Sequence, residues 1–230
     1  MSDPEPRRKR EHNAQGTREA ILNAAEVVFA EHGFDGARFD AIAQAAGYNK
    51  SLIGQYFGDK LGLYAEVNKR IDREVNALGT RLLVPLLEDE TVVADAQRFR
   101  TFLETTIGTL FDFMLAHPRL IRIIHWEQAE GWQTFIKIFS QFETEDTGQI
   151  RELFHKARRA GLLRSDFDPL VQLTLAEQIC WSYLATIPLY QIMLPGVDLS
   201  SAAELARARE YIVAFVVRGL MGDSNEVTVE

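Results

Sequence analysis

Residues 50–56 carry the side chains whose types and spacing are best suited to recognising another macromolecule. Lys50 can donate to a phosphate oxygen or to the acceptors of guanine, and Gln55 can form two hydrogen bonds with adenine. Leu52 can touch the methyl group of thymine, and Tyr56 can donate its hydroxyl to a phosphate. This mixture is suited to the major groove of DNA.

The same segment has the period of a short helix. Ile53 and Phe57 are one turn apart and predict its buried face, while Asn49 is a good N-cap and Gly58 ends the segment. The predicted outward positions are Lys50, Ser51, Leu52, Gln55 and Tyr56.

Two further helices are predicted before this one. Apolar residues recur at helical spacing from Ile21 to Phe29, before a stop at Gly33, and again from Phe39 to Ala46, before Gly47. Two short helices joined by a glycine-containing turn form a helix-turn-helix, whose second helix enters the major groove.

The stretch TREAILNAAEVVFAEHGFDGARFDAIAQAAGYNKSLIGQYFGDKLGLYAEV, about residues 17–67, resembles the DNA-binding domain of TetR-family transcriptional regulators. The resemblance rests on ILNAAEVVFAEHGF, on IAQAAG before the turn and on YFGDKLGLY after the recognition helix. It implies a homodimer with two recognition helices in successive major grooves. It also implies an all-α C-terminal domain whose ligand occupancy controls DNA affinity.

Some residues beside the recognition helix depart from the family pattern or extend the expected DNA contacts. Arg38 occupies the usual capping position of the second helix, Ser51 replaces a common glycine, and Gly54 replaces a common tyrosine. Asp40 can accept from a cytosine amino group or repel phosphate. Lys60, at the first turn of the fourth helix, is expected to contact a phosphate. The expected DNA-binding residues are Arg38, Lys50, Ser51, Leu52, Gln55, Tyr56 and Lys60.

The acidity of the chain is concentrated away from this segment. The 230 residues have a formal net charge of −8, of which residues 1–64 contribute −1 and residues 65–230 contribute −7. A nearly neutral domain can bind DNA when its cations cluster, because counterion release depends on local phosphate contacts. Arg7 to Arg10, Arg18, Arg38, Lys50 and Lys60 are candidates for that cluster, and the basic arm can enter the minor groove or remain solvated.

The remaining sequence has helical periods over about 92–116, 118–130, 132–160, 168–193 and 199–220, without a strand pattern. We therefore expect an all-α fold, with an N-terminal three-helix helix-turn-helix domain and a larger helical C-terminal domain for ligand binding and dimerisation. The expected divisions are a flexible basic arm (1–16), the DNA-binding domain (17–63), the effector-binding and dimerisation domain (64–222) and a flexible tail (223–230).

Aromatic and polar residues of the C-terminal region suggest a pocket for an uncharged or aromatic small molecule. Its candidate lining residues are His125, Trp126, Gln128, Gln178 and Tyr183. The last two helices are apolar on more than one face, as expected for a dimer interface, although the same residues suit an intramolecular core. The candidate interface residues are Tyr190, Leu194, Leu205, Tyr211, Ile212, Phe215 and Val216.

Enzymatic machinery is not evident in the sequence. The single cysteine, Cys180, lies in an apolar run and is expected to be a buried inert thiol, and Glu152 and His155 form only one metal-ligand pair. We expect no enzyme, no cofactor and no metal site. Polar residues and prolines within 178–197 argue against a membrane span, so a cytoplasmic protein is expected. The alternative function is an all-α small-molecule-binding or scaffolding protein without specific DNA binding.

Overall fold

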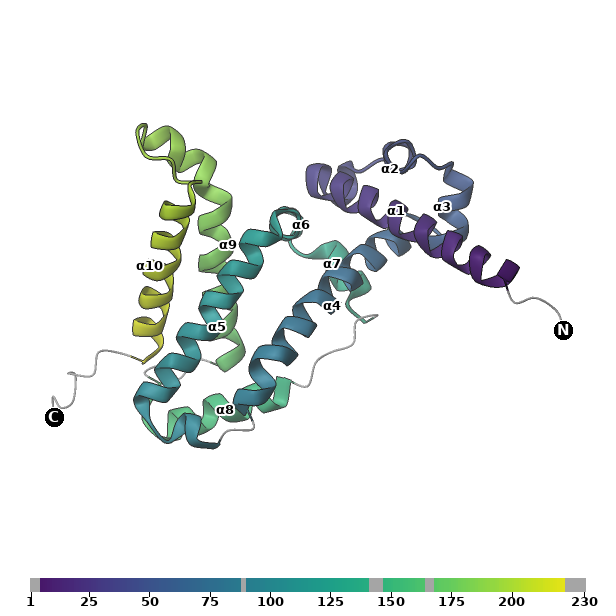
Figure 1. Ribbon diagram of the computed structural model, residues 1–230. Coiled ribbons are helices and arrows are strands. Elements are labelled where there is room, and N and C mark those ends of the chain that lie inside the picture. The colour runs from purple at the N-terminus through teal and green to yellow at the C-terminus, as the bar shows by residue number, and fades with distance from the viewer. Residues whose placement is uncertain (1–4, 88–89, 141–146, 164–167, 222–230) are drawn as a thin grey trace. The chain divides into compact units, whose positions relative to one another are not determined.

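The computed structural model describes residues 5–87, 90–140, 147–163 and 168–221, and its regular elements there are all helices (Figure 1). The all-α prediction is confirmed for these ranges, while the expected tail at 223–230 lies outside them. The helices are α1 (Glu5–Gly36), α2 (Phe39–Ala46), α3 (Lys50–Phe57), α4 (Lys60–Leu87), α5 (Ala96–Ala116), α6 (Pro118–Ala129), α7 (Gln133–Phe139), α8 (Thr147–Arg159), α9 (Pro169–Met193) and α10 (Ala202–Met221), with a 3₁₀ turn at Glu90–Val93.

The chain divides into two compact units. The first comprises residues 1–75 and 119–143, and so contains α1, α2, α3, the first half of α4, α6 and α7. Its core includes buried residues from α1, α2 and α3, together with Ile123 of α6 and Ile138 of α7. The first unit thus includes two helices that follow the DNA-binding segment by some 50 residues.

Helix α1 begins earlier than expected and is interrupted at Gly33, where the sequence predicts its end. It begins at Glu5, so residues 5–16 are helical rather than a flexible arm, and Pro6 lies in the first turn, where proline is tolerated. The side chains of Arg7 to Arg10 lie outside the described part. At the other end, Gly33 has φ 67° and ψ −179°, which interrupts the helix before its last turn.

The single helix expected over 132–160 is instead two, α7 and α8. Gly131 and Trp132 both have positive φ, which sets the sharp start of α7 after α6. Helical periodicity therefore predicted the type of element here and missed the break between α7 and α8.

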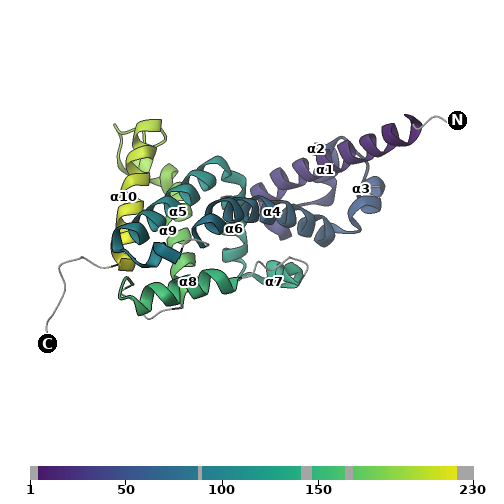
Figure 2. The same cartoon turned by 60° about the horizontal axis from the view of Figure 1, so that its bottom comes forward.

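The second unit comprises residues 76–118 and 144–230, with α5 lying beside both α9 and α10 (Figure 1, Figure 2). Phe99 and Phe111 of α5, Cys180 of α9 and Val217 of α10 are fully buried or nearly so. The Arg209 side chain donates to Asp112 at 2.8 Å and lies directly against Gly108 of α5, where a Cβ atom would overlap it. This close approach ties α10 to α5.

Within the described part of the chain, no helix has both the length and the apolar character needed to cross a lipid bilayer.

Cys180 should be unreactive while the protein is folded. Its side chain is completely buried, and burial raises the pKa of the thiol to about 12. A thiol reagent at pH 8 should therefore label the folded protein at least about 100-fold more slowly than the urea-unfolded protein. Because this pKa is raised, the protonated Cys180 thiol stabilises the folded state fully below the unfolded pKa of about 8.5. This contribution to the free energy of unfolding is lost as the pH rises toward 12. Equal labelling rates for folded and unfolded protein would contradict this burial.

Candidate DNA-binding surface and effector region

The recognition helix α3 is held as the sequence predicts. The Asn49 side chain accepts a hydrogen bond from the Leu52 backbone N–H at 2.8 Å and so caps the helix. Ile53 and Phe57 are buried in the core of the first unit, which fixes the direction of the opposite face.

The five residues expected on the outward face differ in exposure. Lys50, Ser51 and Gln55 are exposed, whereas Leu52 and Tyr56 are half-buried, and Tyr56 packs against the core. The exposed positions therefore offer an ammonium, a hydroxyl and an amide from one short helix. These groups can donate to phosphates and to base edges.

Lys50 forms an ion pair across the turn of the helix-turn-helix. Its Nζ lies 2.6 Å from Oδ1 of Asp40, a residue in the first turn of α2. Both side chains are exposed, so the pair is accessible at the surface.

Lys60 lies at the first turn of α4, as expected, and its ammonium is bound within the chain. Its Nζ donates to the carbonyl oxygens of Phe34 and Ala37 at 2.9 and 3.1 Å, and it lies 4.5 Å from the centre of the Phe34 ring. The interruption of α1 at Gly33 leaves carbonyl groups without regular helical donors, and this ammonium binds them. Lys60 thus joins the start of α4 to the end of α1, and a phosphate would compete with these carbonyls.

The other cations expected at the DNA differ in whether they are accessible. Arg38 is exposed at the N-cap position of α2 and makes no capping bond there, so it is accessible. Arg18 instead pairs with Glu66 of α4 and lies 5.4 Å from the centre of the Phe57 ring. The cluster of cations expected from the sequence is therefore smaller, because Arg18 and Lys60 join helices to one another.

A buried polar contact joins α4 to α6. The Tyr64 hydroxyl donates to Oε1 of Glu127 at 2.5 Å, and the Phe135 backbone N–H donates to Oε2 at 3.0 Å. Tyr64 and Glu127 are 1% and 2% exposed. Burial, reinforced by the bonded Glu127 carboxylate, raises the pKa of Tyr64 well above its ordinary value. Nothing in the local sequence places Glu127 against Tyr64, because the two residues are 63 positions apart and only the fold brings them together.

Helix α6 also contacts the interrupted end of α1. Arg122 Nε and Trp126 Nε1 both donate to the Ala30 carbonyl, at 2.9 and 3.3 Å. The Trp126 indole lies so close to Gly33 that a Cβ there would be 2.9 Å from Cδ2 of the ring. Trp126, expected to line an effector pocket, thus lies on α1 with part of its surface exposed.

The five candidate effector residues fall in different units. His125, Trp126 and Gln128 are on α6 in the first unit, whereas Gln178 and Tyr183 are on α9 in the second. Burial lowers the pKa of His125, which favours its neutral form. The Tyr183 ring lies beside those of Phe111 and Tyr190, at 6.4 and 6.2 Å between ring centres. A pocket common to all five residues stays a prediction.

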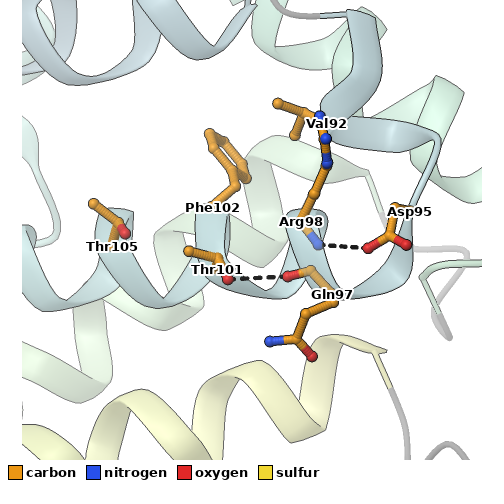
Figure 3. Close-up of a pocket in the computed structure, with 7 residues that line it drawn as sticks. All are labelled: Val92, Asp95, Gln97, Arg98, Thr101, Phe102 and Thr105. Atoms are coloured by element: carbon orange, nitrogen blue, oxygen red, sulfur yellow. Dashed lines mark hydrogen bonds between the residues drawn. The ribbon is translucent and has the colours of Figure 1, made fainter.

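The second unit contains a pocket of about 420 Å³ that the sequence did not indicate (Figure 3). Asp95 at its edge caps α5 by accepting from the Arg98 N–H at 2.9 Å. The lining mixes apolar, hydroxyl and charged groups, from Val92, Asp95, Gln97, Arg98, Thr101, Phe102 and Thr105. None of the five candidate effector residues belongs to this set. Nothing in the local sequence separates these side chains from an ordinary polar helix face.

The candidate dimer residues separate into three groups by exposure. Tyr211 and Phe215 are 71% and 57% exposed and their rings stack, and Leu194 is also exposed. Tyr190 and Leu205 are half-buried. Ile212 and Val216 are buried within the chain, so the intramolecular alternative describes them better. The exposed apolar residues Leu189, Ile192 and Met193 were not among the candidates.

Comparisons with known proteins agree with this arrangement. Residues 21–67 match the model of bacterial regulatory proteins of the tetR family, and residues 100–216 match a tetracyclin repressor-like C-terminal domain. The chain is 36% identical over 116 residues to the HTH-type transcriptional repressor SCO4008 of Streptomyces coelicolor. That alignment covers 50% of this chain and 52% of the relative, about half of each.

Two further similarities extend over most of the chain. The HTH-type transcriptional repressor NicS of Pseudomonas putida is 25% identical over 213 residues, which are 92% of this chain and 95% of NicS. A crystal structure of the transcriptional regulator SCO4942 from Streptomyces coelicolor has a TM-score of 0.57 and 28% identity. That match covers 89% of this chain and 98% of SCO4942.

Proposed function

Because the chain belongs to the TetR family of bacterial regulatory proteins, we propose that it is a homodimeric repressor that a small effector releases from its DNA operator. The chain is a helix-turn-helix, DNA-binding regulator of transcription, and repression, dimerisation and the effector are the proposed parts. The observation that carries the proposal is the capped recognition helix with Lys50, Ser51 and Gln55 exposed on it. We further propose that the protein acts in the cytoplasm.

The exposed apolar residues of α9 and α10 support self-association. It is unfavourable to leave large apolar side chains in water unless another apolar surface covers them. Those exposed here include Tyr211, Phe215, Leu194 and Ile192. A two-fold pair of identical surfaces covers both copies at once. Two recognition helices would then contact half-sites one DNA turn apart, about 34–36 Å.

The effector is proposed to act through α6 and α4. Helix α6 contacts α1 through Trp126 and Arg122, and contacts α4 through Glu127 and Tyr64. A ligand that moved α6 would change these contacts and thereby the placement of α3 in the dimer. We propose an uncharged or aromatic effector, supported by the partly exposed aromatic groups Trp126 and Tyr183.

Selection from randomised DNA duplexes at about 0.15 M salt tests the proposal. The parent should enrich a two-fold-symmetric site. Lys50→Ala should bind that site at least about tenfold more weakly, because a donor is lost from each half-site. Phe215→Glu should dissociate the dimer in sedimentation and lose the symmetric preference.

Lys137→Ala is the matched control, since it removes an exposed lysine on α7. It should bind like the parent. Failure of the parent to enrich any sequence would contradict operator binding and favour a small-molecule-binding protein. Once the operator is known, an effector that leaves operator affinity unchanged would contradict the proposed release.

A further inference from the structure

The ion pair of Asp40 and Lys50 contributes too little to folding stability to account for its position. The two side chains meet at 2.6 Å and are 76% and 52% exposed. Exposed ion pairs of this kind contribute little to folding, because water and salt screen them and both side chains lose freedom. The pair nevertheless lies at the first turn of α2 and the first residue of α3.

The positions of both charged side chains are fixed by the backbone of the helices that carry them. Asn49 caps α3 directly before Lys50, and the completely buried Ile42 and Ile53 hold α2 and α3 in one core. The N-terminal residues of a recognition helix are those that contact base edges in the major groove. A carboxylate and an ammonium are therefore presented side by side at the position where bases are recognised.

We propose that Asp40 and Lys50 together recognise one G·C base pair in each half-site, an inference that rests on the proposed operator binding. In the major groove, a G·C pair presents the N7 and O6 acceptors of guanine beside the N4 amino donor of cytosine. Lys50 donates to guanine while Asp40 accepts from cytosine. The neighbouring donor and acceptor of the protein thus match the neighbouring acceptor and donor of the base pair.

The same geometry predicts which base pairs are rejected. With the pair in this orientation, an A·T pair would place the O4 acceptor of thymine against the Asp40 carboxylate. A C·G pair would place a donor against Lys50 and acceptors against Asp40. A T·A pair presents one suitable acceptor and one suitable donor, but lacks the second acceptor of guanine. The expected order of preference is G·C, then T·A, then A·T and C·G.

Asp40 also changes what Lys50 does at phosphates. An isolated lysine attracts any phosphate, and this electrostatic contribution to binding does not depend on the DNA sequence. The carboxylate at 2.6 Å neutralises the ammonium and repels phosphate, so the pair favours base contacts over non-specific binding. Asp40 is thus inferred to determine specificity more than affinity.

The test is a comparison of operator selection by the parent, Asp40→Ala, Lys50→Met and the double variant. The parent should show the predicted order at one position of each half-site. Asp40→Ala should lose discrimination against A·T there by about tenfold, with the other positions unchanged. It should also bind random duplex more tightly, with a steeper dependence on salt, because Lys50 is freed. The double variant should lose no more discrimination than either single variant.

Glu31→Ala is the matched control, because it removes another exposed carboxylate from the same unit. It should leave the base preferences unchanged, and thermal unfolding should show that all variants are folded. If Asp40→Ala strengthened binding to every duplex equally, with base preferences intact, Asp40 would only screen Lys50 and the inference would be overturned. A selected operator without a G·C preference would also overturn it while leaving the proposed function intact. No enrichment by the parent would contradict the proposed function itself.

Discussion

Gly33→Ala is expected to lower the free energy of unfolding by about 3–5 kcal/mol. Gly33 has φ 67° and ψ −179°, a conformation that side chains other than glycine rarely adopt, and it is buried. An added Cβ would also lie 2.9 Å from the Trp126 ring, which would have to move away from the Ala30 carbonyl. The substitution should therefore weaken both α1 and its contact with α6.

Urea unfolding of Gly33→Ala, Trp126→Ala and the double variant separates the two effects. In the Trp126→Ala background, Gly33→Ala should cost only the backbone strain, about 1–3 kcal/mol. Gly47→Ala is a useful control, because Gly47 has φ 73° but nothing within 4 Å of an added Cβ. It should cost about 1–2 kcal/mol. Equal losses for Gly33→Ala with and without Trp126 would show that the indole does not constrain this glycine.

Tyr64→Phe is expected to cost about 2–4 kcal/mol of unfolding free energy, although it removes one oxygen atom. The hydroxyl is the partner of Glu127 Oε1 in a region where both residues are almost completely buried. Without the hydroxyl, Glu127 Oε1 loses its donor, and the carboxylate keeps only the bond from the Phe135 N–H to Oε2. Tyr211→Phe should change stability by less than about 0.5 kcal/mol, because the Tyr211 side chain is 71% exposed.

The dependence on pH distinguishes this contact from simple packing. Burial raises the pKa of Tyr64, so the protonated form stabilises the fold fully below the unfolded value of about 10. That stabilisation is lost as the pH rises above this value. The parent should accordingly lose more stability than Tyr64→Phe between about pH 9 and 11. Parallel curves for the two proteins would contradict the proposed contribution of the hydroxyl. Combining Tyr64→Phe with Glu127→Leu should restore part of the lost stability, since the carboxylate left without its donor is then removed as well.

The sequence determined the local elements of the DNA-binding segment. Apolar spacing predicted α2 and α3, and side-chain chemistry predicted Asn49 as a cap, which accepts from the Leu52 N–H at 2.8 Å. It also predicted that Ile53 and Phe57 are buried. These features depend on residues within one or two turns of each other, so their pattern is contained in a short stretch of chain.

The sequence was less informative where helices end within a continuous apolar pattern. It predicted one helix over 132–160, but Gly131 and Trp132 take positive φ before α7, and α8 is a separate helix. It also predicted a flexible arm over residues 1–16, of which residues 5–16 are helical in α1. Periodicity identifies the type of an element more reliably than its ends, since both sides of a break have the same period.

Only the tertiary structure decided which charged and polar groups meet. In the free protein the Lys60 ammonium binds carbonyls of α1, and Glu127 accepts from Tyr64, 63 residues away in sequence. The pairing of Asp40 with Lys50 likewise depends on how α2 and α3 pack. A side chain's type states what it can bind, but its partner depends on the approach of distant segments, and that approach is set by the packing of the whole core.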